Sequence, residues 1–522
     1  MLSIIYPLSF IISLTGLVFW FYYKGNKSKS RLMSTIFIAG FFAYLVSLGF
    51  AEGELSAKLL ILCRDMFAMG IVSQVFHYAV KNKLLFFGLY LGLIALFKFV
   101  FYKQMETSYL QMGIDKVENV QAEEKLSNDI SDDFELLVDL KNADDLKNLS
   151  KIIDKYELTV EYAFDMKSES ITDLDDYVAI GIPDHQESKI QIIIQELKSS
   201  GYVDYVESND SIQLDPAEFK AVKENPTKKR NYGINDPGIS ELWSFERMKM
   251  DELYSYINKN KIKVIDKALI AILDTGVDAK HEDLEENFVS TRRKYNSDKQ
   301  GHGTHCAGIA AAVSNNKKGV ASFSPNNEFV QVTSVKVLSD YGSGTQRGIV
   351  NGMIEAADKG ADVISMSLGG RSAVNKQKAY IDAVKYCNDK GAIVVVAAGN
   401  NGANAKDISP ANVKGVITVS AIDASLDKAV FSNHIKDVAM GIAAPGVNIY
   451  SSVPGNEYKK FSGTSMATPY VAGLVGVMKS IKKDLTTKEA YQILRKSGAT
   501  TNHDKETGKL IQPTGALELL LK

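Results

Sequence analysis

Three short segments of the chain carry side chains that together could perform nucleophilic catalysis. Ser465 lies in residues 463–469, where small residues and a proline predict a tight turn that exposes the hydroxyl at the start of a helix. A serine hydroxyl is a weak nucleophile and needs a base within hydrogen-bond reach. His302, in a glycine-rich segment, can take and return that proton, and Asp274, at the end of an apolar run, can fix the imidazole tautomer.

The surroundings of these three residues are specific. They read AILDTGVD around Asp274, GHGTHCAG around His302 and GTSMATP around Ser465, in the order acid, base, nucleophile. In wording and in order they resemble the subtilases, the family of subtilisin-like serine proteases, which use this chain order for their triad. The resemblance covers residues 235–522 strongly and residues 134–210 more weakly, and it says nothing about the residues before them.

The resemblance implies the remaining parts of a protease site. Asn400, in the segment AAGN, would donate a side-chain N–H to the oxyanion, together with the backbone N–H of Ser465. One further segment would pair with the residues before the scissile bond, and another would form the wall of the pocket for the residue before the cut. These segments are Gly342, Ser343 and Gly344, and Ser367, Leu368 and Gly369.

Three neighbours of the triad residues have structural explanations. His305 follows His302 by one helical turn and is expected to lie beneath the site. Cys306 is expected to be a buried small hydrophobe, because the three cysteines of the chain are too few and too scattered for a disulfide framework. Tyr470 stands where the family usually has a histidine, and we expect it to affect packing rather than chemistry.

A calcium site is suggested only by the resemblance to the subtilases. Asp283 and Asn316 match side-chain ligands of the family's high-affinity calcium site, and the carbonyls of Lys318 and Val320 fall in the matching loop. Calcium takes about six to eight oxygen ligands, of which these are a part, and Lys317 and Lys318 oppose a cation electrostatically. The chemistry itself requires no cofactor, so any calcium would be structural.

Length and charge fix the broad class. The 522 residues are enough for two or three domains, and a formal net charge of −2 gives no electrostatic reason to expect nucleic acid as a partner. From residue 235 onward, apolar strand candidates alternate with amphipathic helices, which predicts an α/β catalytic domain at residues 235–522 with a parallel sheet flanked by helices. The strand candidates are residues 268–273, 329–337, 363–366, 393–397 and 416–421, and helices are expected at 344–359 and 372–390.

Residues 134–214 predict a small separate domain. Their pattern gives the order β-α-β-β-α-β, which is ferredoxin-like, with Asn142 capping the first helix and Asp184 with Glu187 forming a capping box for the second. In subtilases a propeptide of this architecture precedes the protease as folding aid and inhibitor, so the resemblance implies that role. A plain spacer is the alternative. Residues 215–234 read as an exposed connector, and its basic triplet at residues 228–230 as a solvated loop or a processing site.

Residues 1–103 predict a transmembrane region, and residues 104–133 a polar linker. A span needs about 20 apolar residues, and the candidates are residues 2–23, 32–51, 59–80 and 84–102. The third candidate carries Arg64 and Asp65, and charges inside a bilayer are costly, so three or four spans stay open. Four spans place the basic loops 24–31 and 81–83 in the cytoplasm and the protease on the non-cytoplasmic side, as the positive-inside tendency favours.

These features predict a membrane-anchored serine endopeptidase that works through an acyl-enzyme intermediate. Its expected partners are polypeptide substrates, its own propeptide-like domain and the lipid bilayer. The alternatives are a noncatalytic membrane receptor or scaffold that keeps a protease fold for peptide binding, and a multi-span transport or sensor protein with an accessory protease. The intact set of Asp274, His302, Ser465 and Asn400 favours the enzyme, since a binder has no need of all four.

Overall fold

The computed structural model describes residues 2–49, 55–96, 134–166, 172–214, 232–371 and 377–522. The chain divides into two units, Met1–Asn128 and Asp129–Lys522. The linker predicted at residues 104–133 lies outside the described residues, as do residues 215–231 of the predicted connector with the basic triplet.

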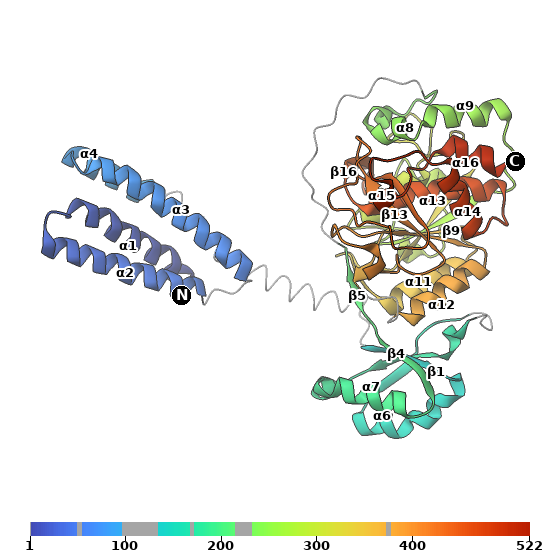
Figure 1. Ribbon diagram of the computed structural model, residues 1–522, viewed down its shortest axis with the longest axis horizontal. Coiled ribbons are helices and arrows are strands. Elements are labelled where there is room, and N and C mark those ends of the chain that lie inside the picture. The colour runs from blue at the N-terminus through green and yellow to red at the C-terminus, as the bar shows by residue number, and fades with distance from the viewer. Residues whose placement is uncertain (1, 50–54, 97–133, 167–171, 215–231, 372–376) are drawn as a thin grey trace. The chain divides into compact units, whose positions relative to one another are not determined.

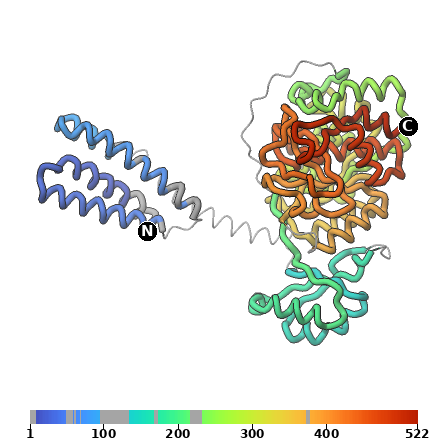
Figure 2. The backbone as a smooth tube through the Cα atoms, viewed as in Figure 1, coloured from blue at the N-terminus to red at the C-terminus, as the bar shows by residue number. Residues whose placement is uncertain are grey.

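The helices of the first unit follow the four predicted apolar stretches. Short turns join them into two helical hairpins, α1 with α2 and α3 with α4 (Figure 2). Apart from their charged ends and Arg64, Asp65, Gln74 and His77 of the third helix, the sequences are apolar or small. This composition favours helices that bury their surface against one another or in lipid. The helices are α1 (Leu2–Tyr22), α2 (Lys27–Gly49), α3 (Leu55–Ala79) and α4 (Lys83–Leu96).

The helices α1 and α2 approach one another closely. A Cβ atom built on Gly40 of α2 would lie 2.7 Å from the backbone nitrogen of Ser13 on α1, so this contact accepts only glycine. Small residues at such a crossing let the backbones of two helices pack closely, as is typical of helices that associate within lipid.

Asp65, the charge that makes the third span doubtful, is buried and paired. Its carboxylate accepts hydrogen bonds from the hydroxyl of Tyr44 on α2 at 3.0 Å and from Nε of Arg64 at 2.9 Å. The side chain of Arg64 is 46% exposed, whereas that of Asp65 is 6% exposed. The ion pair and the tyrosine therefore lower the cost of burying this carboxylate between helices.

Length and composition single out one of these helices. Lys27–Leu48, within α2, is the one stretch of the described residues that is both long and apolar enough to cross a bilayer. The apolar stretches Leu8–Tyr22 and Lys83–Ile94 are shorter. By this criterion the unit has one N-terminal candidate, compatible with a single anchor or with a signal sequence, and the prediction of several spans rests on the sequence pattern alone.

The second unit begins with a small four-stranded module, residues 134–214. All its strand pairs are antiparallel, in the order β2-β3-β1-β4, and the predicted succession of strands and helices is the one observed. The elements are β1 (Leu136–Leu140), α6 (Ser150–Tyr156), β2 (Thr159–Tyr162), β3 (Tyr177–Gly181), α7 (Ile190–Ser199) and β4 (Val203–Ser208).

The two helical segments of this module begin differently from one another. Asn142 accepts the backbone N–H of Asp144 at 3.0 Å, as predicted, although the first turns are 3₁₀ before α6 begins. The predicted capping box of Asp184 and Glu187 is wrong, because no side chain caps that segment. Pro183 takes the cap position with an extended backbone, which puts Asp184 inside the first turn.

The predicted parallel sheet of the catalytic module has six strands in the order β14-β13-β11-β9-β6-β7. Its strands β9 and β13 are labelled in Figure 1. Five of them were predicted. The sixth, β14, has glycine and proline at its two ends, and these residues mask its strand pattern. The strands are β6 (Ala268–Asp274), β7 (Val330–Lys336), β9 (Val363–Met366), β11 (Ile393–Ala397), β13 (Val416–Ile422) and β14 (Gly441–Pro445).

Both faces of this sheet are covered. Alternate residues of β6 show it: Ile270 and Ile272 join the core with α10 (His302–Ala311) and α13 (Thr464–Ile481). Ala271 and Leu273 join a second core with α11 (Gln346–Asp358) and α12 (Lys378–Asp389). Burial on both faces explains why β6 reads as a continuous apolar run up to Asp274.

Candidate active site

The catalytic candidates lie at the ends of neighbouring elements. Asp274 is the last residue of β6, His302 is the first residue of α10, and Ser465 is the second residue of α13. The helices α10 and α13 pack side by side, since Cys306, one turn after His302, lies with its Sγ 3.5 Å from the carbonyl oxygen of Ser465. Ligands of open parallel sheets bind at the carboxyl ends of the strands, which is where Asp274 lies.

Asp274 and His302 form a close pair. Nδ1 of His302 lies 2.8 Å from Oδ1 and 2.9 Å from Oδ2 of Asp274, whose side chain is fully buried. A carboxylate can only accept, so Nδ1 carries the proton and Nε2 is left as the acceptor. This is the tautomer that a general base needs at Nε2.

Two carboxylates raise the pKa of the His302 imidazole. Burial alone would lower the pKa of this imidazole, but the charge of Asp274, its hydrogen bond and the more distant charge of Asp298 together raise the pKa above its usual value of 6.5. Asp298 is itself held by the loop: it accepts hydrogen bonds from Thr304, Thr275 and the backbone N–H of Gly301. Sequence analysis did not identify Asp298 as part of the site.

Ser465 has a different partner in this structure. Its Oγ donates to the carbonyl oxygen of Ser367 at 3.2 Å, and Ser367 Oγ donates back to the carbonyl oxygen of Ser465 at 2.8 Å. Within the described residues no hydrogen bond joins Ser465 to His302. The hydroxyl must therefore turn away from Ser367 before its proton can pass to the imidazole.

Asn400 and the start of α13 face one small space. Oδ1 of Asn400 accepts both the backbone N–H and the hydroxyl of Thr464, at 2.8 and 2.9 Å. A Cβ atom built on Gly463 would lie 3.5 Å from Nδ2 of Asn400 and 3.6 Å from the backbone nitrogen of Ser465. Two N–H donors thus border one position beside Gly463. An oxyanion hole needs two donors of this kind aimed at one position.

A segment of the chain itself lies along the predicted substrate edge. Strand β5 (Ser211–Gln213) pairs antiparallel with β8 (Ser343–Thr345), with Ile212 opposite Gly344. The N–H of Leu214 donates to the carbonyl of Gly342 at 2.9 Å. On the other side, a Cβ atom on Gly370, which directly follows the second predicted substrate segment, would lie 3.2 Å from Ile212. The segment therefore lies between residues 342–344 and the end of residues 367–370.

Comparison with known proteins adds to this geometry. Residues 266–511 match the model of the Subtilase family. Over 218 residues the chain is 44% identical to thermitase from Thermoactinomyces vulgaris, which covers 41% of this chain and 75% of thermitase. This chain belongs to the subtilase family. Subtilisin DY from Bacillus licheniformis is 40% identical over 240 residues, covering 45% of this chain and 83% of that protein. A solved protease from Pseudoalteromonas arctica aligns with a TM-score of 0.48 and 26% identity, covering 55% of this chain and 99% of that one.

As a subtilase the chain is a serine endopeptidase, and polypeptides are its substrates. The side chains near Asp274, His302 and Ser465 have the environments expected for structural residues. His305 is buried against Phe461, and burial lowers its pKa to about 3, so it stays neutral. Burial raises the pKa of the Cys306 thiol, which makes it unreactive. Tyr470 is buried and hydrogen-bonded to Ser244 at 2.7 Å.

The residues matched to a calcium site surround one loop of the subtilase module. Oδ1 of Asp283 accepts from the Asn316 side chain and Oδ2 from the N–H of Val320, both at 2.8 Å. Asp236, which the sequence analysis did not single out, accepts the N–H groups of Asn315 and Asn316. Burial raises the pKa of Asp283 to about 7, and the nearby charges of Asp236 and Glu282 add to the effect.

This donor set fits a hard cation. Asp236 and Asp283, two buried carboxylates that repel one another, both contact the loop that carries the Asn316 amide. A divalent ion there would offset the cost of burying the carboxylates and the repulsion between them. Asn316 presents its amide nitrogen to Asp283 here, and a half-turn of that amide would present its oxygen instead.

The four-stranded module is held against two catalytic helices at their starts. Glu207 accepts the backbone N–H groups of Lys378 and Ala379, at 2.9 and 2.8 Å, at the start of α12. Asn209 accepts the N–H of Arg347 at 2.9 Å, near the start of α11. A carboxylate at a helix start interacts favourably with the helix dipole, although burial raises the pKa of Glu207 to about 7.

Arg347 is the most connected residue of this interface. Its guanidinium donates to the carbonyls of Ala163 (3.0 Å) and Tyr162 (3.2 Å), pairs with Glu161 and lies over the ring of Phe134. Lys378 makes a second crossing ion pair with Asp139 at 2.6 Å. The sequence did not single out either cation, because each lies on a helix that reads as ordinary and amphipathic.

Proposed function

We propose that this subtilase is a membrane-anchored endopeptidase in which Ser465 is the nucleophile, His302 the general base and Asp274 the residue that orients the base. The observation that carries the proposal is the contact of Asp274 with His302 at 2.8 Å, on a helix packed against the start of α13, where Ser465 lies.

The proposed reaction follows from these positions. The Ser465 hydroxyl turns from Ser367 toward Nε2 of His302 and gives up its proton as Oγ attacks the substrate carbonyl. Nδ2 of Asn400 and the backbone N–H of Ser465 donate to the oxyanion, while Asp274 stabilises the imidazolium. His302 then protonates the leaving amine, and water hydrolyses the acyl-enzyme by the same proton route.

A peptide library tests the role of Ser465. Residues 235–522 should hydrolyse peptides, and the Ser465→Ala variant, which loses only one oxygen atom, should keep its fold and lose the activity. The matched control is Ser462→Ala, on the loop just before α13, which should stay active. Hydrolysis by the Ser465→Ala chain at the wild-type rate would contradict the assignment.

We further propose that residues 134–214 inhibit the protease in the intact chain. Support comes from β5, which occupies the edge that a substrate would use, with Ile212 and Leu214 largely buried there. An added strand of this kind gains affinity from its backbone hydrogen bonds and excludes other peptides. A titration of the separate module against residues 235–522 should show inhibition, and its absence would reduce the module to a spacer.

A structural calcium ion is also proposed, with Asp283, Asn316, Asp236 and the carbonyls of Lys318 and Val320 as the residues that would hold it. It would cross-link the segment around Asp236 to the loop that carries Asn316, and it has no role in the chemistry. A chelator should lower Tm, and added calcium should restore it. The Asp283→Asn variant should lose this response; an unchanged Tm in the wild-type chain would exclude the site.

The membrane anchor is proposed with four spans and the protease on the non-cytoplasmic side. The turns α1–α2 and α3–α4 carry the basic residues, so both lie on one face if all four helices cross, in line with the positive-inside tendency. The pairing of Asp65 with Tyr44 and Arg64 makes a buried α3 less costly. A reporter fused after Leu214 should be active outside the cytoplasm. Cytoplasmic reporter activity would contradict this topology.

A further inference from the structure

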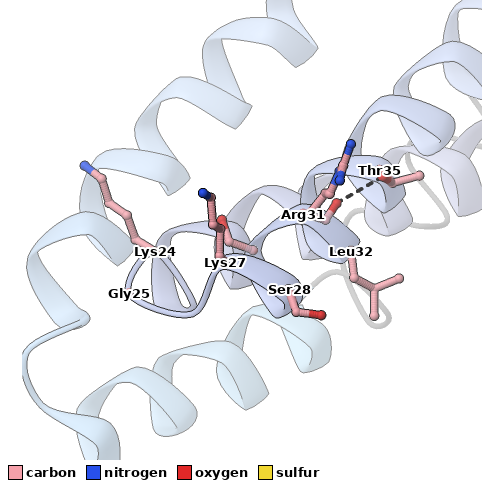
Figure 3. Close-up of a pocket in the computed structure, with 8 residues that line it drawn as sticks. Lys24, Gly25, Lys27, Ser28, Arg31, Leu32 and Thr35 are labelled. Atoms are coloured by element: carbon pink, nitrogen blue, oxygen red, sulfur yellow. Dashed lines mark hydrogen bonds between the residues drawn. The ribbon is translucent and has the colours of Figure 1, made fainter.

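The turn between α1 and α2 forms an open basic cleft. The cleft has a volume of about 1010 Å³, and three of the residues that line it are the cations Lys24, Lys27 and Arg31. Figure 3 shows these three side chains projecting to the same side of the turn, with Ser28 and Leu32 on the other. The hydroxyl of Thr35 donates to the Arg31 carbonyl at 3.0 Å.

Within the first unit these cations are not neutralised by a carboxylate of the described chain. Asp65 is the one carboxylate among residues 2–49 and 55–96, and it accepts hydrogen bonds from Arg64 and Tyr44. Lys27 and Arg31 are four residues apart on α2, a spacing at which like charges repel. A counter-charge from outside the chain would relieve this repulsion.

We propose that this cleft binds the phosphate of an anionic lipid headgroup. This inference rests on the proposed membrane location. The cleft lies at the first residues of Lys27–Leu48, the stretch long and apolar enough to cross a bilayer, so its cations would lie at the level of the headgroups. An arginine can bind a phosphate through two parallel N–H···O hydrogen bonds. Lysines add positive charge that attracts an anionic surface.

The chain offers a matched control for the test. Lys29 lies on the same turn of α2 but does not line the cleft, and its ammonium lies over the ring of Tyr23, 5.2 Å from the centroid. Lys27→Gln, Arg31→Gln and Lys29→Gln therefore remove one charge each, the first two from the cleft and the third from beside it.

The experiment titrates fluorescent phosphatidylglycerol into the full chain in neutral detergent, with fluorescent phosphatidylcholine of the same acyl length as the second arm. We expect a preference for phosphatidylglycerol that falls about fivefold in Lys27→Gln and in Arg31→Gln and changes little in Lys29→Gln, at ~1 kcal/mol per basic residue. Equal binding of both lipids, or equal loss in all three variants, overturns the proposal. Inorganic phosphate forms the third arm: displacement of the lipid by millimolar phosphate would assign the cleft to a soluble anion instead.

Failure of the membrane proposal is separable from failure of this one. Alkaline carbonate extraction of cell membranes shows whether the full chain is integral to the bilayer, independently of any headgroup preference. A chain that is extracted as a soluble protein contradicts the anchor and the lipid site with it. A chain that stays in the membrane without preferring phosphatidylglycerol contradicts the lipid site alone.

Discussion

Thr464 donates both its backbone N–H and its hydroxyl to Oδ1 of Asn400, at 2.8 and 2.9 Å. With the amide oxygen held by two donors, the amide nitrogen faces the opposite side, toward the space beside Gly463 that the N–H of Ser465 also borders. Thr464 is therefore a positioning residue for Asn400, and both act on the same proposed oxyanion.

Removal of the Asn400 side chain tests this arrangement. Asn400→Ala should lower kcat by about 10²–10³-fold and leave KM nearly unchanged, because the lost hydrogen bond forms only in the transition state; the magnitude is the one measured for this asparagine in subtilisin. Thr464→Val should lower kcat by a smaller factor, since it removes only one of the two hydrogen bonds to Oδ1. Thr464→Ser keeps the hydroxyl and should have nearly the wild-type activity. A rise in KM with an unchanged kcat would assign Asn400 to substrate binding instead.

The pH dependence of kcat/KM should report on His302. The imidazole must be neutral to act as base, and the charges of Asp274 and Asp298 raise its pKa, so the acid limb should have its midpoint above pH 6.5. Asp298→Asn removes one of these charges and should move the limb to lower pH. Asp423→Asn removes a charge from a turn outside the site and should leave the pH profile unchanged. An acid limb with the same midpoint in Asp298→Asn as in the wild-type chain would contradict the account.

The module of residues 134–214 should bind more weakly as the pH rises. Burial raises the pKa of Glu207 from 4.5 to about 7 and that of Asp139 from 3.8 to about 6 where the module meets the catalytic helices. This prediction takes both carboxylates to be hydrated in the separated module, with their ordinary pKa values. The complex then holds more protons than its separated parts, so affinity is highest below about pH 4, falls up to about pH 7 and is then level. Inhibition titrations across this range should follow that course.

Glu207→Gln provides the control for this pH dependence. Its neutral amide keeps a carbonyl oxygen for the N–H groups of α12, so the variant should still inhibit while its affinity changes less between pH 4.5 and pH 7. An unchanged pH dependence in the variant would show that another group is responsible.

Arg347 should dominate the same interface. Arg347→Ala removes the hydrogen bonds to Ala163 and Tyr162 and the ion pair with Glu161. Truncation of an arginine anchor of this kind lowers the binding free energy by ~2 kcal/mol or more, so the inhibition constant should rise about 30-fold. Arg495→Ala, on an exposed residue of α14 (Thr487–Ser497) in the catalytic module, is the control. Peptide hydrolysis by residues 235–522 alone should be unaffected by either change.

The sequence predicted most of the strands and the positions of the chemical groups, and it missed the contacts that link them. The apolar run before Asp274 and the turn before Ser465 are local patterns, so their elements could be predicted. Asp298 lies in a polar loop, and only the folded chain brings it near His302. The capping box at Asp184 failed because Pro183 shifts the start of the helix by one residue, a competition that the spacing of residues does not encode.

The central claim, that Ser465 is an activated nucleophile, has one direct test. The catalytic module, residues 235–522, is incubated with a fluorophosphonate, which labels only activated serines, and the labelled peptide is mapped by mass spectrometry. The account predicts one labelled residue, Ser465, with labelling lost in Ser465→Ala and strongly slowed in His302→Ala. Full labelling of the Ser465→Ala chain, or a label on another serine, would contradict it.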